Sequence, residues 1–313
     1  MRLLLHHWDT DGICSAALLY DEECVNMTPR IGNYFLEEEE IDWIRSNDFE
    51  EIWVVDLALH ESSMKKIVQK ASVVVFDHHL TKKIDGVSYV NPIMEGKDEE
   101  KWPSASWVVG NYLEKKDLLS YLGIVGDWEE RIKETNFYPI LKKFMDENGF
   151  TFEELHEMVY LIDANYKIGD KKEVEEAVKK IWKAEDKAAF ILNNKKWRER
   201  KEMIEREIKK AIEAEEERIG EIRIKRIRCP YNIISTVARK LWNKDEYVVV
   251  INDGYFKENC QVYVRGNNVG NLIHMAIERG YVAGGKKNVM GAIIPKERCE
   301  EFIKKILEVI KNG

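Results

Sequence analysis

The sequence predicts an α/β protein of two domains, in which a long helix joins an N-terminal parallel-sheet domain to a smaller C-terminal α/β domain. Short apolar runs alternate with amphipathic segments in the first part of the chain. The runs that we expect to be strands span 2–6, 52–56, 72–77 and 87–90, and the expected helices span 12–21, 37–46, 61–70 and 103–115. Alternation of this kind indicates a parallel sheet with helices on both faces.

The middle of the chain is mainly helical. Residues 194–219 are dense in Lys, Arg and Glu and carry one apolar stripe, so we interpret them as one long helix; the stripe is Trp197, Ile204, Ile208 and Ile212. Further strands are expected at 222–227, 247–251 and 261–264, and further helices at 233–242, 271–278 and 296–311. The predicted boundaries are 1–192 for the first domain, 193–220 for the linker helix and 221–313 for the second domain.

The composition restricts the class of protein. With 313 residues, 44% of them hydrophobic, the chain can form two cores. A net charge of −8 is not typical of a nucleic-acid binder, but bound divalent ions would offset it. Five cysteines without CxxC spacing indicate a reducing, cytoplasmic setting. The opening apolar run has only three leucines, and no run approaches the roughly 18 residues of a membrane span, so we expect neither signal peptide nor membrane contact.

Acidic residues and histidines follow four apolar runs, which we interpret as strands that all end in the same way. The runs and their polar ends are Leu3-Leu4-Leu5 before His6-His7-Trp8-Asp9-Thr10-Asp11-Gly12, Ile52-Trp53-Val54-Val55 before Asp56, Val73-Val74-Val75-Phe76 before Asp77-His78-His79, and Leu122-Gly123-Ile124-Val125-Gly126 before Asp127. The carboxyl ends of parallel strands are the usual place for an active site.

Each polar residue also has a simpler explanation. Asp9 or Asp11 can cap a helix that starts near Ile13, Asp56 can cap the helix at 60–70, and Asp127 can be a turn residue. Taken together, these explanations would leave several charges buried at strand ends without compensation, which is costly. Oxygen ligands with a few imidazoles suit Mn²⁺ or Mg²⁺. Two such ions, roughly 3.5–4 Å apart, activate water and clamp a phosphate, so the predicted reaction is phosphoryl hydrolysis.

The same residues resemble the motifs of the DHH phosphoesterase superfamily, in the family's order. The segments Gln261-Val262-Tyr263-Val264-Arg265-Gly266 and Gly284–Ala292 resemble the DHH-associated C-terminal domain of the RecJ-like and oligoribonuclease branch. The resemblance extends over nearly the whole chain and is greatest to compact archaeal RecJ-like exonucleases, some of which work with a repair helicase.

The resemblance implies a role for each residue. It assigns one metal ion to His7, Asp9 and Asp56, and a second to Asp11, Asp56, His78 and Asp127, with Asp56 bridging the two. Two Mn²⁺ ions are implied, with Mg²⁺ as the alternative. Asp77 would support the histidines or complete the coordination, and His79 would contact the scissile phosphate. Ser104 and Ser106 would assist, although capping of a helix is the simpler role for them.

In the second domain the resemblance implies a substrate-binding set: Arg265, Gly284, Gly285, Lys286, Asn288 and Gly291. One residue departs from the family pattern, because Lys286 stands where the family usually has a histidine after the two glycines. Lysine neutralises a phosphate as a point charge but does not shuttle protons easily near neutral pH.

Three functional hypotheses follow. The first is a Mn²⁺-dependent exonuclease on single-stranded DNA or RNA, acting from the 3′ end and releasing nucleoside monophosphates. The second is a phosphodiesterase or phosphatase for small substrates such as short oligonucleotides, cyclic dinucleotides or phosphoadenosine phosphate. The third is a scaffold partner of a repair or replication helicase. Dependence on substrate length separates the first two, and intact metal binding argues against the third.

Overall fold

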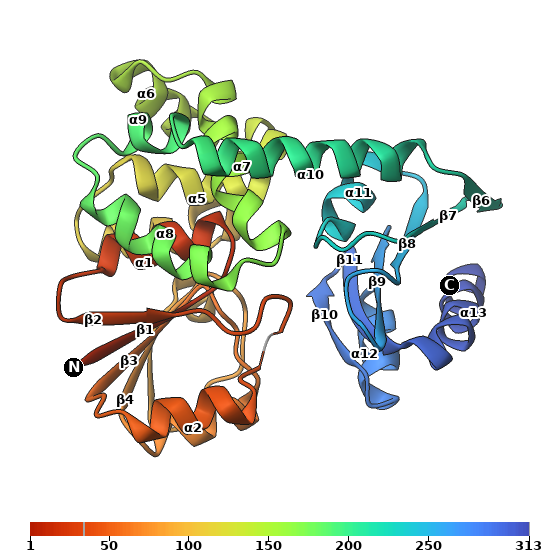
Figure 1. Cartoon of the computed structure of the whole chain (residues 1–313), viewed down its shortest axis with the longest axis horizontal. Coiled ribbons are helices and arrows are strands. Elements are labelled where there is room, and N and C mark those ends of the chain that lie inside the picture. Colours follow the sequence, from red (N-terminus) through yellow and green to blue (C-terminus); the bar gives the residue numbers. More distant parts are fainter. Residues whose placement is uncertain (34, 313) are drawn as a thin grey trace. The chain divides into compact units, whose positions relative to one another are not determined.

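The computed structural model describes residues 1–33 and 35–312, and of Asn312 the backbone only. Its contacts divide the chain into two compact units, Met1–Lys201 and Glu202–Gly313, and each is described here by itself. Figure 1 shows the helices and strands with their labels.

The first unit contains the predicted parallel sheet, with five strands in the order β2-β1-β3-β4-β5. The strands are β1 (Arg2–His6), β2 (Cys24–Met27), β3 (Glu51–Val55), β4 (Ser72–Phe76) and β5 (Val87–Val90). His6 pairs with Val55, and Val55 pairs with Phe76. The three central strands therefore end level, and the residues that follow them start side by side. The edge strand β2 was missed, because its four residues are too short and too polar to give a strand pattern.

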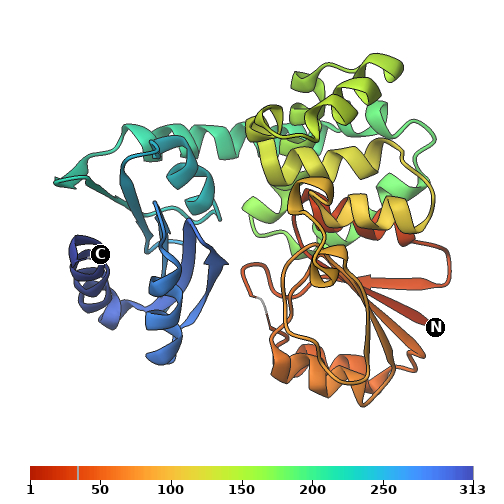
Figure 2. The same ribbon diagram turned by 180° about the vertical axis from the view of Figure 1, so that it is seen from behind.

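Helices cover both faces of this sheet, as predicted (Figures 1 and 2). On one face, α2 (Glu38–Ser46) and α3 (Glu61–Val68) share a core with Leu3, Val54 and Val75. On the other, α1 (Thr10–Leu19) and α4 (Ala105–Tyr112) pack on alternate residues of the same strands, such as Leu4 and Phe76. This alternation follows from the two-residue period of a strand.

A helical layer completes the first unit. It consists of α5 (Leu118–Trp128), α6 (Tyr138–Asn148), α7 (Phe152–Lys167), α8 (Lys171–Lys183), α9 (Lys187–Leu192) and the start of α10 (Lys195–Glu213), with short 3-10 turns at Pro92–Glu95, Glu99–Lys101 and Glu129–Glu134. Trp197 of α10 is fully buried in this layer.

The expected helix at 194–219 is too long. It ends at Glu213, and residues Glu216–Ile219 form strand β6. The buried ammonium group of Lys225 explains the stop, because it donates to the carbonyl oxygens of Ile212 and Ala214 at the end of the helix. Basic groups satisfy the last carbonyls of a helix in this way.

The second unit is a six-stranded mixed sheet in the order β10-β11-β9-β8-β7-β6. Besides β6 it contains β7 (Ile222–Ile227), β8 (Tyr247–Asn252), β9 (Asn259–Arg265), β10 (Val282–Lys286) and β11 (Val289–Pro295), with helices α11 (Ile234–Leu241), α12 (Gly270–Glu278) and α13 (Lys296–Asn312). The expected glycine loop at 284–292 is instead the hairpin of β10 and β11. Lys286 pairs with Val289, so Lys287 and Asn288 form the two-residue turn that such a hairpin requires.

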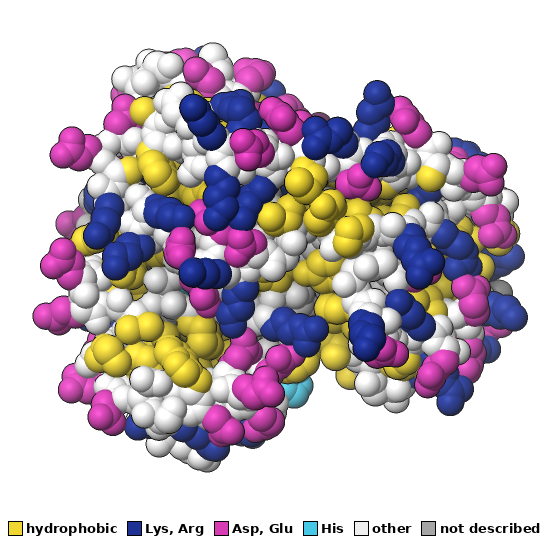
Figure 3. All heavy atoms as spheres, viewed as in Figure 1, with side chains coloured by type: hydrophobic (Ala, Val, Ile, Leu, Met, Phe, Trp, Pro, Cys, Tyr) yellow, Lys and Arg dark blue, Asp and Glu magenta, His cyan; other side chains and the backbone are white. Residues whose placement is uncertain are grey.

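No helix among the described residues is long and apolar enough to cross a membrane. On the face shown in Figure 3, basic and acidic side chains are interspersed over both units. On this face the acidic side chains are thus spread among basic ones and do not form one large acidic patch.

Candidate metal centre

The turn from β1 into α1 carries the first group of predicted residues. The helix begins at Thr10, earlier than expected, and Asp9 caps it by accepting a hydrogen bond from Gly12 N at 3.2 Å. Asp9 also lies 2.8 Å from Nδ1 of His7. A Cβ atom on Gly12 would come within 2.4 Å of the carbonyl oxygen of His7. This tight turn therefore needs glycine, and it brings His7 and Asp9 together.

Asp11 is not a helix cap but a buried anion at the start of another helix. Its two carboxylate oxygens accept hydrogen bonds from Ala105 N at 2.7 Å and Ser106 N at 2.8 Å. These amides belong to the first turn of α4, where free N–H groups and the helix dipole favour a negative charge. Ser104 is the N-cap of that helix, accepting from Trp107 N. The capping role considered for Ser104 is therefore confirmed.

Asp56 lies between two histidines at the end of β3. Its carboxylate oxygens are 3.6 Å from His7 Nδ1 and 3.7 Å from His78 Nε2. Its backbone has a φ of 53°, which is uncommon for a residue other than glycine. The alternative role as a cap of α3 is wrong, because His60 caps that helix.

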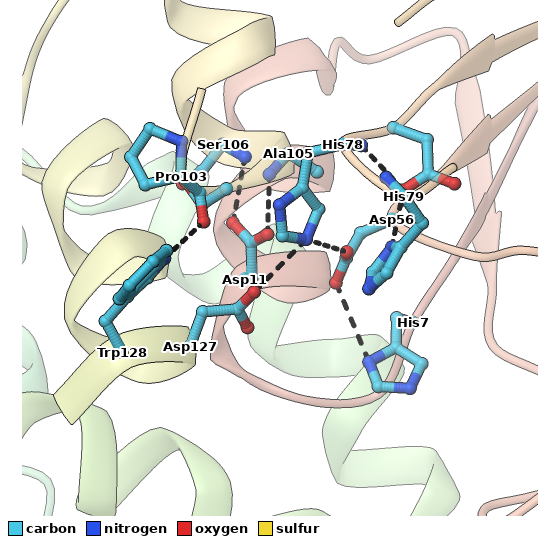
Figure 4. Close-up of polar contacts among 12 residues, drawn as sticks. His7, Asp11, Asp56, His78, His79, Pro103, Ala105, Ser106, Asp127 and Trp128 are labelled. Carbon is cyan, nitrogen blue, oxygen red and sulfur yellow. Dashed lines mark hydrogen bonds and ion pairs between the residues drawn. The ribbon is translucent and has the colours of Figure 1, made fainter. Parts of the chain in front are cut away.

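The Asp77-His78-His79 segment follows β4, and its three side chains make different contacts. Asp77 is fully buried, and its Oδ1 accepts from the backbone N of His78 at 2.7 Å and from Nδ1 of His79 at 2.8 Å. His78 instead points its Nε2 towards Asp127, at 3.1 Å from Oδ2. Figure 4 shows His79 beside Asp56 and His7.

The interpretation of residues 122–126 as a strand is wrong. They lie in α5, and Asp127 is in its last turn. The close packing of this helix explains the apolar run: a Cβ atom on Gly123 would meet Asp11 Oδ1 and Ser106 Oγ at 2.1 Å. Asp127 therefore reaches the site from a helix that packs against α1, not from the sheet.

The predicted residues of the first unit thus come together. Ligand atoms lie within 4.8 Å of one another in three overlapping groups: His7, Asp9 and Asp56; Asp11, His78 and Asp127; and Asp56, Asp77, His78 and His79. Figure 4 shows most of these side chains converging from β1, α1, β3, β4 and α5.

The electrostatics of this cluster favour a cation. Burial, together with the charges of Asp11 and Asp9, raises the pKa of Asp56 well above its usual value. Burial and Asp127 raise the pKa of Asp11 to about 7. Although burial opposes it, the charge of Asp9 raises the pKa of His7. Carboxylates that repel one another in this way, with imidazoles between them, fit hard divalent cations.

The predicted residues of the second unit lie at one end of its sheet. Gly284, Gly285 and Lys286 are in β10, an edge strand, so alternate backbone groups point away from β11. Gly291 pairs with Gly284, and Lys286 and Asn288 are exposed. Arg265 is buried, with its guanidinium 5.0 Å from the ring centre of Trp242.

Sequence reasoning missed several residues that support the cluster. Asn91 donates to the carbonyl oxygen of His79 at 2.8 Å. Trp128 donates from Nε1 to the carbonyl oxygen of Pro103 at 2.9 Å. Asp163 of α7 accepts from Thr10. The one available signal was the polar residue Asp163 between the apolar residues Ile162 and Ala164.

Comparisons with known proteins place this cluster in a family. Residues 3–136 match the model of the DHH family, N-terminal domain. These residues therefore form a DHH domain. The matched residues include all eight predicted side chains of the first unit, and members of the superfamily are metal-dependent phosphoesterases. A search of curated proteins finds no match.

Solved structures with the DHH fold resemble the whole chain at low sequence identity. RecJ from Thermus thermophilus, in complex with Mn²⁺, has a TM-score of 0.67 at 13% identity, covering 100% of this chain and 52% of RecJ. The DHH domain of a member of the s1p family of ribosomal proteins has a TM-score of 0.73 at 16% identity, covering 99% and 86%. The pGpG-specific phosphodiesterase PggH from Vibrio cholrae has a TM-score of 0.52 at 15% identity, covering 100% and 99%. The chain thus spans about half the length of the Thermus RecJ.

Proposed function

We propose that the protein is a two-metal phosphodiesterase that acts as an exonuclease on single-stranded DNA or RNA and releases nucleoside monophosphates, from the 3′ end by family analogy. The observation that carries the proposal is the position of Asp56, whose two oxygens lie 3.6 Å from His7 and 3.7 Å from His78. These two histidines belong to different ligand groups. A carboxylate in that position suits two ions that share one ligand.

The residues divide the work as follows. His7, Asp9 and Asp56 would hold one Mn²⁺, and Asp11, Asp56, His78 and Asp127 the other, with Mg²⁺ as the alternative. Bound ions would supply Lewis acidity and a hydroxide at neutral pH. The α4 amides hold Asp11 in a fixed orientation. Asp77 keeps the proton of His79 on Nδ1 by accepting from it, which leaves Nε2 to contact the phosphate of the substrate.

The second unit would bind the end of the strand. Lys286 and the outward backbone groups of β10 offer a point charge and hydrogen-bond donors, a combination that suits a phosphate. Arg265 and Asn288 lie near the same end of the sheet. Single strands are held by such basic and backbone contacts without the need to read a sequence. A repair helicase or replication protein is a further candidate partner.

The test uses single-stranded DNA, single-stranded RNA and dinucleotides, each labelled at either end, with Mn²⁺ or Mg²⁺. Stepwise shortening of the long strands from the 3′ end, lost in Asp56→Asn and kept in Asp146→Asn, would support the proposal. Asp146 is a matched control because it is an exposed aspartate of α6 in an ion pair with Lys142. Long strands left intact by the wild type would refute it.

A second candidate is a phosphodiesterase for dinucleotides. The match to the pGpG-specific phosphodiesterase covers 99% of that protein, whereas only about half of the Thermus RecJ is covered. The same panel decides between the two. Cleavage of dinucleotides with steady loss of activity on longer strands would favour the dinucleotide enzyme.

A further inference from the structure

The segment between Asp9 and Asp11 is tied to a helix far away in the sequence. Thr10 is almost fully buried, and its backbone N donates to Oδ1 of Asp163 at 2.9 Å. Its hydroxyl lies 2.7 Å from the same oxygen and 3.2 Å from the carbonyl oxygen of Val159. One carboxylate oxygen of Asp163 therefore accepts from both the amide and the hydroxyl of Thr10, the residue between two predicted metal ligands.

The other oxygen of Asp163 has its own partner. Lys167, one turn later on α7, places its ammonium group 3.4 Å from Oδ2. Both side chains are largely buried, with 12% of Asp163 and 6% of Lys167 exposed. Lys167 thus compensates a charge that would otherwise add to the repulsion within the nearby acidic cluster.

We propose that Asp163 is a positioning residue for the metal centre. The Thr10 amide belongs to the peptide group that joins it to Asp9, so the bond to Asp163 sets the orientation of that peptide group. The hydrogen bond of the hydroxyl holds Thr10, the residue that precedes Asp11. Partners of this kind orient the groups that ligate a metal, and their loss typically lowers metal affinity about 10–100-fold. The inference rests on the proposed metal centre, but not on the identity of the substrate.

A purely structural role is the competing explanation, because the same bonds join α1 to α7. The two roles predict different results. A structural contact lowers the melting temperature of the metal-free protein and leaves Mn²⁺ affinity unchanged. A positioning contact weakens Mn²⁺ binding in protein that remains folded.

The experiment is a calorimetric titration of Mn²⁺ into metal-free full-length protein, with the melting temperature of each variant measured without metal. Asp163→Ala is expected to weaken Mn²⁺ binding about 10-fold or more. Thr10→Val removes only the hydroxyl and is expected to give a smaller loss of several-fold. Thr10→Ser keeps the backbone amide and the hydroxyl as donors and should retain the wild-type Mn²⁺ affinity. Asp146→Ala is the control on an exposed surface.

If Asp163→Ala does not fold, Thr10→Val and Asp163→Asn decide the matter. Wild-type affinity and stoichiometry in the folded variants would overturn the proposal, whatever their melting temperatures. The titration contains no nucleic acid. If the wild type leaves the labelled strands intact while Asp163→Ala binds Mn²⁺ more weakly than the wild type, the exonuclease proposal is refuted and the positioning role remains in place.

Discussion

The buried carboxylate of Asp77 and the partly exposed imidazole of His79 form a hydrogen-bonded pair, in which Nδ1 of His79 donates to Oδ1 of Asp77 at 2.8 Å. The same oxygen accepts from the backbone N of both His78 and His79. His79, whose side chain is 32% exposed, is thus held at its buried edge while its other nitrogen remains available. Although burial opposes it, the charge of His79 lowers the pKa of Asp77.

Asp77→Asn should reduce turnover more than it reduces metal binding. An amide keeps the shape of the side chain but can no longer fix the proton on Nδ1, and loss of such a carboxylate partner costs about 10²-fold or more. The measurement is kcat on the substrate that the labelled panel identifies, alongside a Mn²⁺ titration. An equal loss in both would show that Asp77 is a metal ligand instead.

Asp56→Asn should stabilise the metal-free protein while removing its response to Mn²⁺. Burial and the charges of Asp11 and Asp9 make ionisation of Asp56 costly in the metal-free protein, so a side chain that is always neutral removes that cost. Saturating Mn²⁺, at about 100 times the dissociation constant, should add about 2.7 kcal/mol per bound ion to the free energy of unfolding of the wild type and none to that of the variant. Thermal unfolding with and without Mn²⁺ measures both effects, and a lower melting temperature of the metal-free variant would contradict the prediction.

Gly123→Ala should disrupt the metal centre by displacing the side chains of Asp11 and Ser106. The added Cβ atom would meet Asp11 Oδ1 and Ser106 Oγ at 2.1 Å, and overpacking of this kind costs about 1–3 kcal/mol. We expect a lower melting temperature and weaker Mn²⁺ binding. Gly270→Ala, in a helix position with open space around it, is the matched control. A Gly123→Ala variant that behaves like this control would contradict the packing described here.

Glu173 should make the first unit sensitive to acid. This buried carboxylate accepts from Trp197 Nε1 at 2.9 Å and Lys180 Nζ at 2.7 Å and pairs with Lys196. Although burial opposes it, these bonds lower the pKa of Glu173 to about 2. A lowered pKa stabilises the folded state above the unfolded value of about 4.3, and this stabilisation is lost as the pH falls towards 2.

The expected contribution of Glu173 is about 1–3 kcal/mol at neutral pH, because the two lysines are partly exposed. Urea unfolding of Glu173→Gln and wild type should therefore differ by that amount at pH 7 and converge only as the pH falls to about 2. Parallel curves over the whole range would show that the pKa is not lowered.

Lys286→Ala should weaken binding of a single strand without changing chemistry. Lys286 is exposed on the edge strand β10. Loss of one phosphate contact should raise KM several-fold, leave kcat unchanged and reduce the slope of log affinity against log salt by about one. Lys257→Ala is the control, since Lys257 is 94% exposed and lies beyond the opposite end of β9. Equal effects of the two variants would argue against a specific contact.

Local pattern was sufficient for the strands that carry the site. The apolar runs before Asp56 and Asp77 are buried strands of a parallel sheet, since four or five consecutive apolar residues in an α/β protein fit few other places. Pattern failed for residues 122–126, because a helix buried on several sides presents the same apolar run as a strand. It failed for 284–292, because glycines weaken a strand pattern although an edge strand tolerates them.

By itself, the sequence determined which residue types gather at the ends of β1, β3 and β4, since strand register follows from their lengths and apolar pattern. The tertiary structure decided the rest. It placed both oxygens of Asp11 on the amides of α4, brought Asp127 in on a helix, and set Asp163 against Thr10 across a separation of 153 residues. Such contacts depend on how helices pack, and the packing is set by the whole core rather than by any local run of residues.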